Sequence, residues 1–391
     1  MSDVVIVGAK RTAIGSFLGQ FTGTPTPTLG SAAIAGALAQ SGLATGQVDE
    51  VIMGCVLPAG LGQAPARQAM RAAGIPDAAG ATTVNKVCGS GMKAVMLAHD
   101  IIKAGSANAV VAGGMESMTN APHLLNGSRT GVRYGSAEFL DHMAYDGLTN
   151  PYDGKAMGIF GDAACAKYGY DRAAIDAFSA ESARRAQAAQ AAGAFAAEIV
   201  PVTVKTRKGE VVIDRDEEPG KIDLNKIPEL RPAFGKDGVL TAASSSKISD
   251  GAAALVVMSA EAAAAAGAKP LARIVAHATH SQEPEWFTTA PVAAVQSVLA
   301  KAGWNVADVD LFEVNEAFAC VAMAPMSDLG IAHEKLNVNG GALALGHPIG
   351  CSGARLLVTL IHALQARGGK RGVASLCIGG GEATAMAIEL A

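Results

Sequence analysis

A cysteine at position 88 has the surroundings of a chemically active thiol. Cys88 lies in the segment NKVCGSGMK, after a short strand-like run and before a helical one. A thiol at such a strand-to-helix elbow faces unpaired backbone N–H groups and the positive end of a helix, which lower its pKa and favour the thiolate. We therefore expect Cys88 to be a nucleophile. The alternative is a buried structural cysteine in a glycine turn.

Three residues far along the chain have side chains that would assist such a thiol. His347, in GGALALGHPIG, supplies a base, and Cys377 supplies a second thiol just before the glycine run that begins at Gly379. A cysteine paired with a histidine is an activated nucleophile, and the N–H groups of a glycine run are suited to an oxyanion. Asn315, in EVNEAFA, offers an amide donor, although taken alone it is better explained as an N-cap or turn residue.

The two ends of the chain resemble each other, which indicates how these residues are positioned. The segment CGSGMKAVMLAHDI is similar to GCSGARLLVTLIHAL, with Gly91 against Gly353. Flanking segments repeat in the same order at nearly the same separation, EVI against DLF and VVAGGMES against VASLCIGGGEA. Such a repeat predicts two similar halves, and packing about a pseudo-twofold axis would place the His347 loop opposite Cys88. Chance similarity between alanine- and glycine-rich helices is the alternative, and it predicts no constant separation.

The remaining sequence predicts an α/β fold in three parts. Short β-branched runs bounded by glycine alternate with alanine-rich segments of helical length, which is typical of strands buried on both faces. The region between the repeats is richer in Tyr, Asp, Lys and Pro and contains one strong helix, from an N-cap at Asp171 to Gly193. We expect an N-terminal half (1–118 plus 249–268), an inserted loop domain (119–248) with ligand and oligomer contacts, and a C-terminal half (269–391).

Composition excludes several classes of function. The formal net charge is −4 and no Lys/Arg run occurs, so we expect no nucleic-acid partner. No apolar stretch has the length of a membrane span, and the first residues do not resemble a secretory signal. The six cysteines lack C-x-x-C spacing, which favours free thiols and a cytoplasmic location over disulfides or a structural metal. Charged residues make up only 17%, so we expect a homo-oligomer.

A dinucleotide site is the main rival interpretation of the Cys88 segment. Gly89–Ala94 formally matches G-x-G-x-x-A between a strand and a helix. A dinucleotide fold normally carries this motif on its first strand, with an acidic residue about 20 positions later. The first strand here ends in Gly8-Ala9-Lys10, so the pattern is absent where it belongs. No phosphate-binding P-loop and no His/Asp/Glu cluster with metal spacing occurs either, and we expect no metal or cofactor.

Four segments together resemble the thiolases: NKVCGSGMKA, EVNEAFA, NVNGGALALGHPIGCSGAR and CIGGGEA. Their order and spacing also match, and the similarity extends over nearly the whole chain. The resemblance implies a five-layered αβαβα fold of two similar halves with an inserted loop domain, assembled as a dimer or a tetramer. It also implies an acyltransferase whose substrates are coenzyme A thioesters. Ketoacyl synthases share a cysteine-centred fold, but the second cysteine, in CIGGG, favours a thiolase.

The resemblance assigns a role to each candidate catalytic residue. Cys88 would be the acylated nucleophile, His347 the base that activates it, and Cys377 the acid/base at the substrate carbon. Asn315 would hold a water that, with His347, stabilises one oxyanion, while the N–H groups of Cys88 and Gly379 form the second oxyanion site. The implied reaction is a ping-pong Claisen exchange, most simply two acetyl-CoA to acetoacetyl-CoA plus CoA.

The same resemblance implies contacts to coenzyme A and raises a question about them. The residues expected to contact the coenzyme are Ala243, Ser246, Met157, Ala317 and Phe318. Two neighbouring positions depart from the family pattern, because Ser244 replaces the usual Asn and Ala156 replaces a CoA-contacting His. These departures leave open a degradative 3-ketoacyl-CoA thiolase of broader chain length, and a thiolase-like acyl-CoA-binding protein without turnover.

Overall fold

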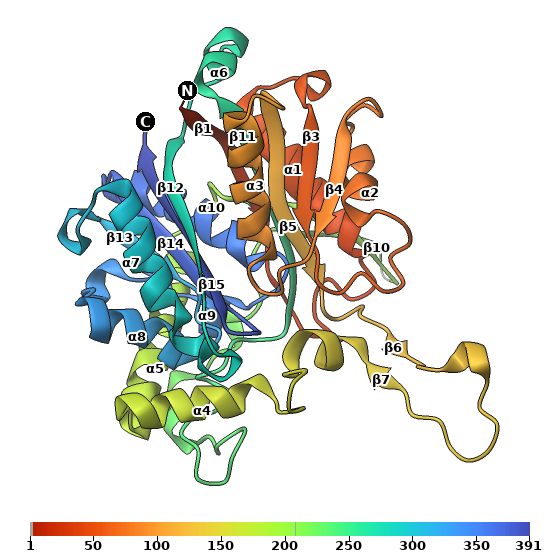
Figure 1. The fold of residues 1–391 in the computed structure, drawn as a ribbon, viewed down its shortest axis with the longest axis vertical. Coiled ribbons are helices and arrows are strands. Elements are labelled where there is room, and N and C mark those ends of the chain that lie inside the picture. Colours follow the sequence, from red (N-terminus) through yellow and green to blue (C-terminus); the bar gives the residue numbers. More distant parts are fainter. Residues whose placement is uncertain (1–2, 208) are drawn as a thin grey trace.

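The computed structural model describes residues 3–207 and 209–391, and its centre is a sheet of two similar halves (Figure 1). The strands of the first half run, in order across the sheet, β4 (Gly80–Val84), β3 (Glu50–Gly54), β5 (Ala109–Ser117), β11 (Ser249–Ser259) and β1 (Val4–Thr12). The second half continues from β1 with β12 (Ala272–Ser281), β15 (Glu382–Leu390), β14 (Arg371–Ile378) and β13 (Leu311–Val314). Counted outwards from the β1–β12 junction, the order β1-β11-β5-β3 corresponds to β12-β15-β14-β13, as the sequence repeat predicted, and the first half adds β4 at its edge.

The two halves are joined by a short pairing at the centre of the sheet. β1 and β12 pair antiparallel over only two residue pairs, whereas β11 and β5 pair over nine. Two more short strands pair with inner strands of this sheet, β2 (Gly15–Ser16) with β11 and β8 (Ile199–Val200) with β1. The narrow junction lets the two halves diverge and leaves room for helices between them (Figure 1).

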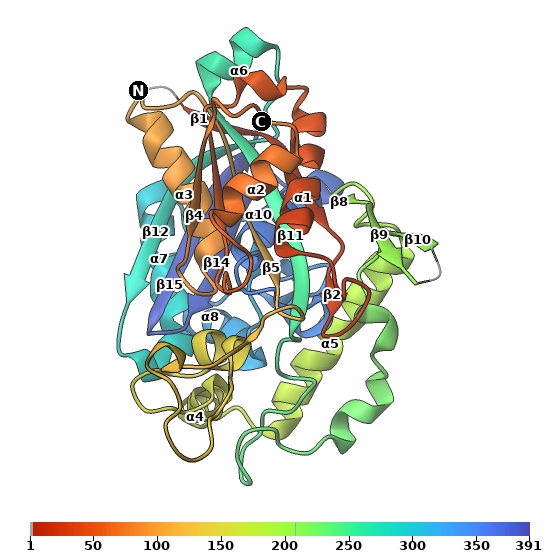
Figure 2. The same cartoon turned by 90° about the vertical axis from the view of Figure 1, so that its right-hand side faces the viewer.

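Helices pack on both faces of each half and complete five layers. α1 (Thr26–Ser41) and α2 (Pro65–Ala72) cover the outer face of the first half, as Figure 2 shows. α7 (Ala290–Ala302) and α8 (Ala319–Leu329) cover the outer face of the second half. Between the halves lie α3 (Ser90–Lys103) and α10 (Ser352–Arg367), packed on each other and on strands of both halves. The short helix α6 (Ala260–Ala266) links β11 to β12.

Small residues bring the two central helices into close contact at their N-terminal ends. A Cβ atom on Gly91 of α3 would lie 2.9 Å from the Ala354 nitrogen, and one on Gly353 of α10 would lie 2.4 Å from the Met92 nitrogen. These two glycines are the pair that the internal repeat aligns. Because neither position has room for a side chain, the loops that precede α3 and α10 meet at the same point.

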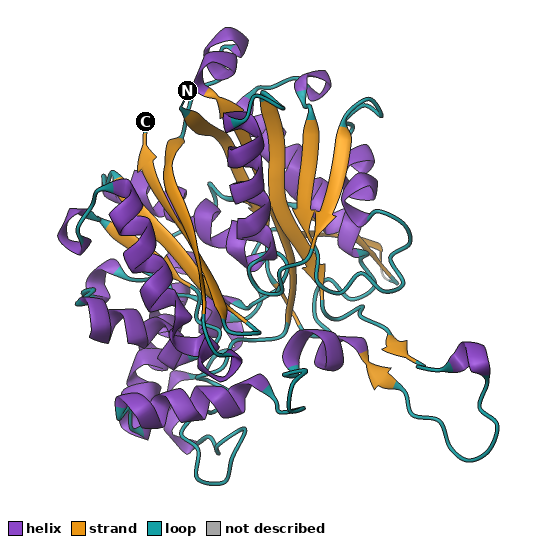
Figure 3. Cartoon of the chain, viewed as in Figure 1, coloured by secondary structure: helices purple, strands orange, loops and turns teal. Residues whose placement is uncertain are grey.

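The segment between β5 and β11 lies mostly outside the sheet. It contains α4 (Met157–Tyr168), α5 (Arg172–Ala191), the paired strands β9 (Val202–Thr206) and β10 (Gly209–Ile213), and the paired strands β6 (His123–Leu124) and β7 (Leu140–Asp141). The Asp171 carboxylate caps α5 by accepting from the Ala174 N–H at 2.8 Å, which confirms the predicted helix start. The β6–β7 hairpin projects away from the body (Figure 3), with Tyr134 fully exposed.

A buried ion-pair cluster anchors this segment to the sheet. The Arg11 guanidinium of β1 donates to Glu198 at 2.6 Å and, through two nitrogens, to Asp216 at 2.7 and 2.8 Å. All three side chains are buried, so the charge of each group is stabilised by the opposite charge of its partners.

Among the described residues, no helix is long and apolar enough to cross a membrane.

Candidate active site

Cys88 lies on a tight elbow between β4 and α3. Val87, directly before it, has φ of 45°, a left-handed conformation that a β-branched residue rarely adopts. The Ser90 hydroxyl holds the elbow by donating to the Val87 carbonyl at 2.7 Å and accepting from the Lys86 N–H at 2.8 Å. A Cβ at Gly89 would lie 2.3 Å from Cδ1 of Ile378, so a larger residue here would have to displace that side chain. The elbow therefore presents Cys88 at the start of α3, directly against the end of β14.

His347 approaches the same point from the other half. It lies between the short helix α9 (Ala342–Leu345) and α10, after Gly346, where a Cβ would lie 2.2 Å from the Ser249 hydroxyl. Its loop contacts the Cys88 region, because Ile349 and Cys88 pack in one small apolar cluster. The repeat therefore places the histidine loop beside the cysteine elbow, as the sequence predicted.

Hydrogen bonds define which ring nitrogen of His347 carries the proton. The Ser352 hydroxyl donates to the Pro348 carbonyl at 2.9 Å, so it accepts from Nδ1 of His347, which lies 2.5 Å away. The proton then resides on Nδ1, and Nε2 carries the lone pair. The Asn315 amide nitrogen lies 3.3 Å from Nε2 and donates to it. Nε2 is therefore the basic nitrogen of the imidazole.

Cys377 and Gly379 complete the cluster from the end of β14. Cys377 is fully buried, and its pKa is well above the ordinary value because of burial and the neighbouring Cys88. The backbone N–H of Gly379 hydrogen-bonds the Cys88 thiol. Asn315 is also fully buried, with its N–H on the Ser375 carbonyl of β14 at 2.9 Å. The structure thus brings together Cys88, His347, Asn315, Cys377 and Gly379.

The expectation of a low-pKa thiolate at Cys88 is wrong for the free protein. Burial raises the pKa of Cys88 to about 11, and the hydrogen bonds from the N–H groups of Gly379 and of Cys88 itself only partly offset this. Burial, together with the charge of Arg355, lowers the pKa of His347 to about 3. The resting pair is therefore a neutral thiol beside a neutral imidazole, so proton transfer must accompany attack on a substrate.

An apolar cavity of about 280 Å³ opens beside His347. Three of the five residues expected to contact coenzyme A line it, namely Met157, Ser246 and Phe318. Ala317 adjoins it, since its carbonyl accepts from the Ser246 N–H at 3.0 Å. Ala243 instead lines a neighbouring pocket of about 230 Å³. Lys247 lines both pockets and so lies between them.

The two positions that depart from the family pattern are accommodated differently. Ser244 is buried and accepts from the Thr241 N–H at 2.7 Å, so its hydroxyl holds the loop rather than facing the cavity. Ala156 lines the cavity directly, at the N-cap of α4. Of the two changes, only the one at Ala156 alters a wall of the cavity.

Sequence reasoning missed two residues that position this site. Ser352 lies only five residues after His347, a short separation that could have identified it as the imidazole partner. Glu116, fully buried in β5, accepts from the N–H groups of Val56, Leu57 and Gly350 at 2.8–3.1 Å. Burial raises the pKa of Glu116 to about 7, although these hydrogen bonds oppose the shift. No local pattern identifies Glu116, because its partners lie on two distant loops.

Two family matches cover nearly all of the chain. Residues 4–261 match the family described as thiolase, N-terminal domain, and residues 268–390 match thiolase, C-terminal domain. The chain belongs to the thiolase family.

Similar proteins extend the match over full length. The acetyl-CoA acetyltransferase of Chromobacterium violaceum is 51% identical, covering 99% of each chain. Acetyl-CoA acetyltransferase 2 of Arabidopsis thaliana is 50% identical, covering 99% of this chain and 97% of the relative. The crystal structure of the Bacillus anthracis acetyl-CoA acetyltransferase superimposes with a TM-score of 0.97 at 39% identity, covering 100% of this chain and 99% of that one. The thiolase fold predicted from the sequence is confirmed.

Proposed function

We propose that this protein is an acetyl-CoA C-acetyltransferase that interconverts two acetyl-CoA with acetoacetyl-CoA and CoA. The observation that carries the proposal is the position of Cys88, whose thiol is near the Gly379 N–H and packs against Ile349 of the loop that carries His347, while His347 and Ile349 line an apolar cavity. Full-length relatives at about 50% identity carry the name acetyl-CoA acetyltransferase, which supports the acetyl group as substrate.

The first half-reaction acylates Cys88. As the thiol attacks the acetyl carbonyl of acetyl-CoA, its proton passes to Nε2 of His347, and the N–H of Gly379 stabilises the oxyanion. The tetrahedral intermediate collapses when CoA leaves, and the leaving sulfur takes the proton from His347. The products are acetyl-Cys88 and CoA, with the imidazole neutral again.

The second half-reaction forms the carbon–carbon bond. His347 first takes the proton of Cys377, and the Cys377 thiolate removes a proton from the methyl carbon of a second acetyl-CoA, whose carbanion attacks acetyl-Cys88. The Cys88 sulfur leaves and takes the proton from His347, Cys377 keeps the methyl proton, and acetoacetyl-CoA departs. Burial disfavours the Cys377 thiolate, which makes it a strong base once formed. His347 and Asn315 stabilise the enolate oxygen of the second substrate.

The pockets beside the site suggest how coenzyme A lies. The acyl and pantetheine portions would occupy the cavity of Met157, Ser246 and Phe318, with Ala317 in its wall. The adjoining pocket contains Ala243 and three lysines, Lys221, Lys226 and Lys247, against one acidic residue, Asp223, so its net positive lining suits the charged phosphate end. Lys247 would lie along the coenzyme where the two pockets meet.

The exposed hairpin and the free cysteines support expectations about assembly and location. We expect a homo-oligomer, because large apolar side chains on the projecting hairpin, including Tyr134 and Phe139, are exposed in the single chain. Light scattering on the purified protein tests this expectation. The six cysteines, all in the described part of the chain, are free thiols, which fits a reducing cytoplasm.

A thiolysis assay tests the proposed reaction. Loss of the 3-ketoacyl-CoA enolate absorbance would be followed with acetoacetyl-CoA and with substrates of eight to sixteen carbons, for the wild type and Cys88→Ser. Cys165→Ser, a buried free cysteine in α4, is the matched control. The proposal expects the highest kcat/KM for acetoacetyl-CoA and a loss of turnover only in Cys88→Ser. Preference for long chains would indicate a degradative thiolase, and binding without turnover a non-catalytic protein.

A further inference from the structure

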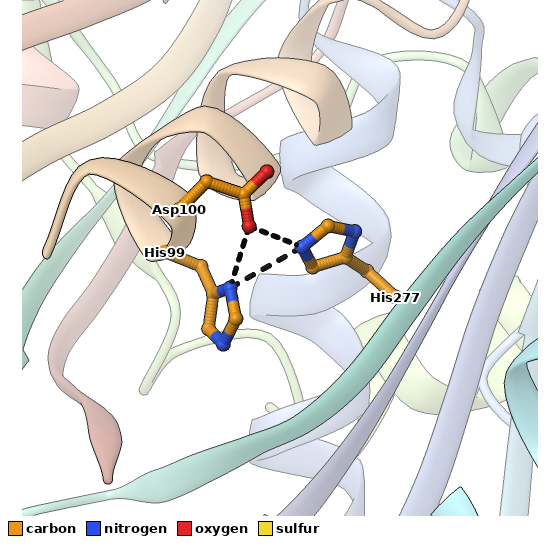
Figure 4. Close-up of side chains that lie close together, drawn as sticks. All are labelled: His99, Asp100 and His277. Atoms are coloured by element: carbon orange, nitrogen blue, oxygen red, sulfur yellow. Dashed lines mark hydrogen bonds and ion pairs between the residues drawn. The ribbon is translucent and has the colours of Figure 1, made fainter. Parts of the chain in front are cut away.

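Two histidines and an aspartate converge at a place remote from the catalytic cluster. His99 and Asp100 lie near the C-terminal end of α3, and His277 lies on β12 (Figure 4). His99 is nine residues after the start of α3, so about 14 Å of helix separates it from the Cys88 elbow. α3 belongs to the segment that matches the N-terminal thiolase domain, and β12 to the segment that matches the C-terminal one. The cluster therefore bridges the two halves of the molecule.

Three potential ligand atoms form a nearly equilateral triangle. Nε2 of His277 lies 2.8 Å from Oδ1 of Asp100 and 3.2 Å from Nδ1 of His99, and Nδ1 of His99 lies 3.0 Å from the same Oδ1. Ligands held at about 2.0–2.1 Å from a Zn²⁺ ion are roughly 3.0–3.4 Å apart. The observed triangle is therefore close to one face of such a coordination shell. Two imidazoles and a carboxylate on one face also match a recurrent set of ligands for divalent transition metals.

The cluster is accessible to a cation from solvent. The Asp100 side chain is 51% exposed, whereas the two imidazoles are mostly buried, so an ion could enter from the carboxylate side. Neutral imidazole nitrogens and carboxylate oxygens are the donor atoms that bind such ions.

We propose that His99, Asp100 and His277 bind one divalent transition-metal ion of the Zn²⁺ class, which clamps α3 to β12. The ion is structural, since it lies at the far end of α3 from the thiol. It would hold α3, which follows the Cys88 elbow, against β12, a strand of the second half that pairs with β15. This site could not be predicted from the sequence, because His277 is 178 residues from His99 and only the fold brings them together.

Metal binding can be measured directly on the full chain. Tag-free protein carrying Cys88→Ser, which removes the partly accessible active-site thiol as a competing ligand, would be titrated with Zn²⁺ by calorimetry. Co²⁺ would then report nitrogen and oxygen ligation through its visible absorption. We expect one ion per chain and a higher unfolding temperature with Zn²⁺, because the ion binds only the folded state.

Three variants separate this site from adventitious binding. His277→Gln and Asp100→Asn should each weaken Zn²⁺ binding by at least about tenfold, since loss of even an outer-shell partner costs about 10–100-fold. His123→Gln removes an exposed histidine of the hairpin and should change nothing. Asp100→Asn, at a half-exposed position, keeps the test valid if His277→Gln does not fold. The proposal is wrong if Zn²⁺ does not bind up to millimolar concentration, or if both cluster variants bind it as the parent does.

Discussion

The hydrogen bond between Ser352 and His347 offers a sharp test of the catalytic geometry. Ser352 is buried, and its hydroxyl accepts the Nδ1 proton of His347 at 2.5 Å while donating to the Pro348 carbonyl at 2.9 Å. This arrangement leaves Nε2 unprotonated, so it can accept the proton of Cys88 in exchange for its hydrogen bond from Asn315. Ser352→Ala removes the acceptor without changing the imidazole itself. Ser352 is thus a positioning residue, and its loss should affect kcat more than substrate binding.

The size of the effect follows from the buried imidazole. Without Ser352, the Nδ1 proton has no acceptor, and an unsatisfied buried donor costs about 1–3 kcal/mol. The imidazole avoids this cost only by moving its proton to Nε2, the nitrogen that must be free. In either case the reactive tautomer becomes less stable by about 1–3 kcal/mol. This penalty corresponds to a fall in kcat of about 5- to 150-fold.

The assay is acetoacetyl-CoA thiolysis with kcat and KM determined across pH. Ser41→Ala is a matched control, because the buried Ser41 hydroxyl also donates to a carbonyl, that of Leu38, and accepts an N–H, that of Leu43. We expect Ser41→Ala to lose some thermal stability but no kcat, and Ser352→Thr to recover part of the lost kcat. A Ser352→Ala enzyme with kcat within about twofold of the wild type would refute the tautomer assignment.

Three further outcomes are expected. Alkylation of Cys88 by iodoacetamide should accelerate about tenfold per pH unit above neutrality, because only the thiolate reacts and burial raises the pKa to about 11. A plateau near neutral pH would mean that a thiolate–imidazolium pair exists instead. Glu116→Gln should lower the unfolding temperature, since an amide has one acceptor oxygen for three N–H groups and each unmet donor costs about 1–3 kcal/mol. The exposed Glu138→Gln should not lower it, and equal stability of both variants would argue against this role of Glu116. Arg11→Leu leaves two buried carboxylates unpaired and should cost about 3–5 kcal/mol in urea unfolding, so an unchanged midpoint would show that the cluster contributes little.

Local sequence signals predicted the scaffold because they reflect backbone requirements. The aligned glycines Gly91 and Gly353 indicated a repeat, and the structure shows them at the crossing of the two central helices. The Asp171 cap located the start of α5, and the β-branched runs located the buried strands. The division into two halves and a separate inserted domain stays a prediction.

Long-range effects were not predictable from the same signals. The helix N-terminus at Cys88 suggested a lowered pKa for the thiol. Burial of the thiol raises this pKa and outweighs the effect of the helix. Ser352 and Glu116 act through contacts that exist only after the repeats have packed. The catalytic roles of Cys88 and its neighbours were inferred by resemblance and stay a prediction.

Trapping the acyl-enzyme tests the central claim most directly. The protein would be incubated with acetyl-CoA, quenched in acid and digested, and the acetylated peptide identified by mass spectrometry in the wild type and in Cys377→Ala. We expect the acetyl group on Cys88 in both proteins, and acetoacetyl-CoA only from the wild type, since Cys377 is needed to deprotonate the second substrate. Acetylation at another residue, or acetoacetyl-CoA production by a Cys88→Ser variant, would contradict the account.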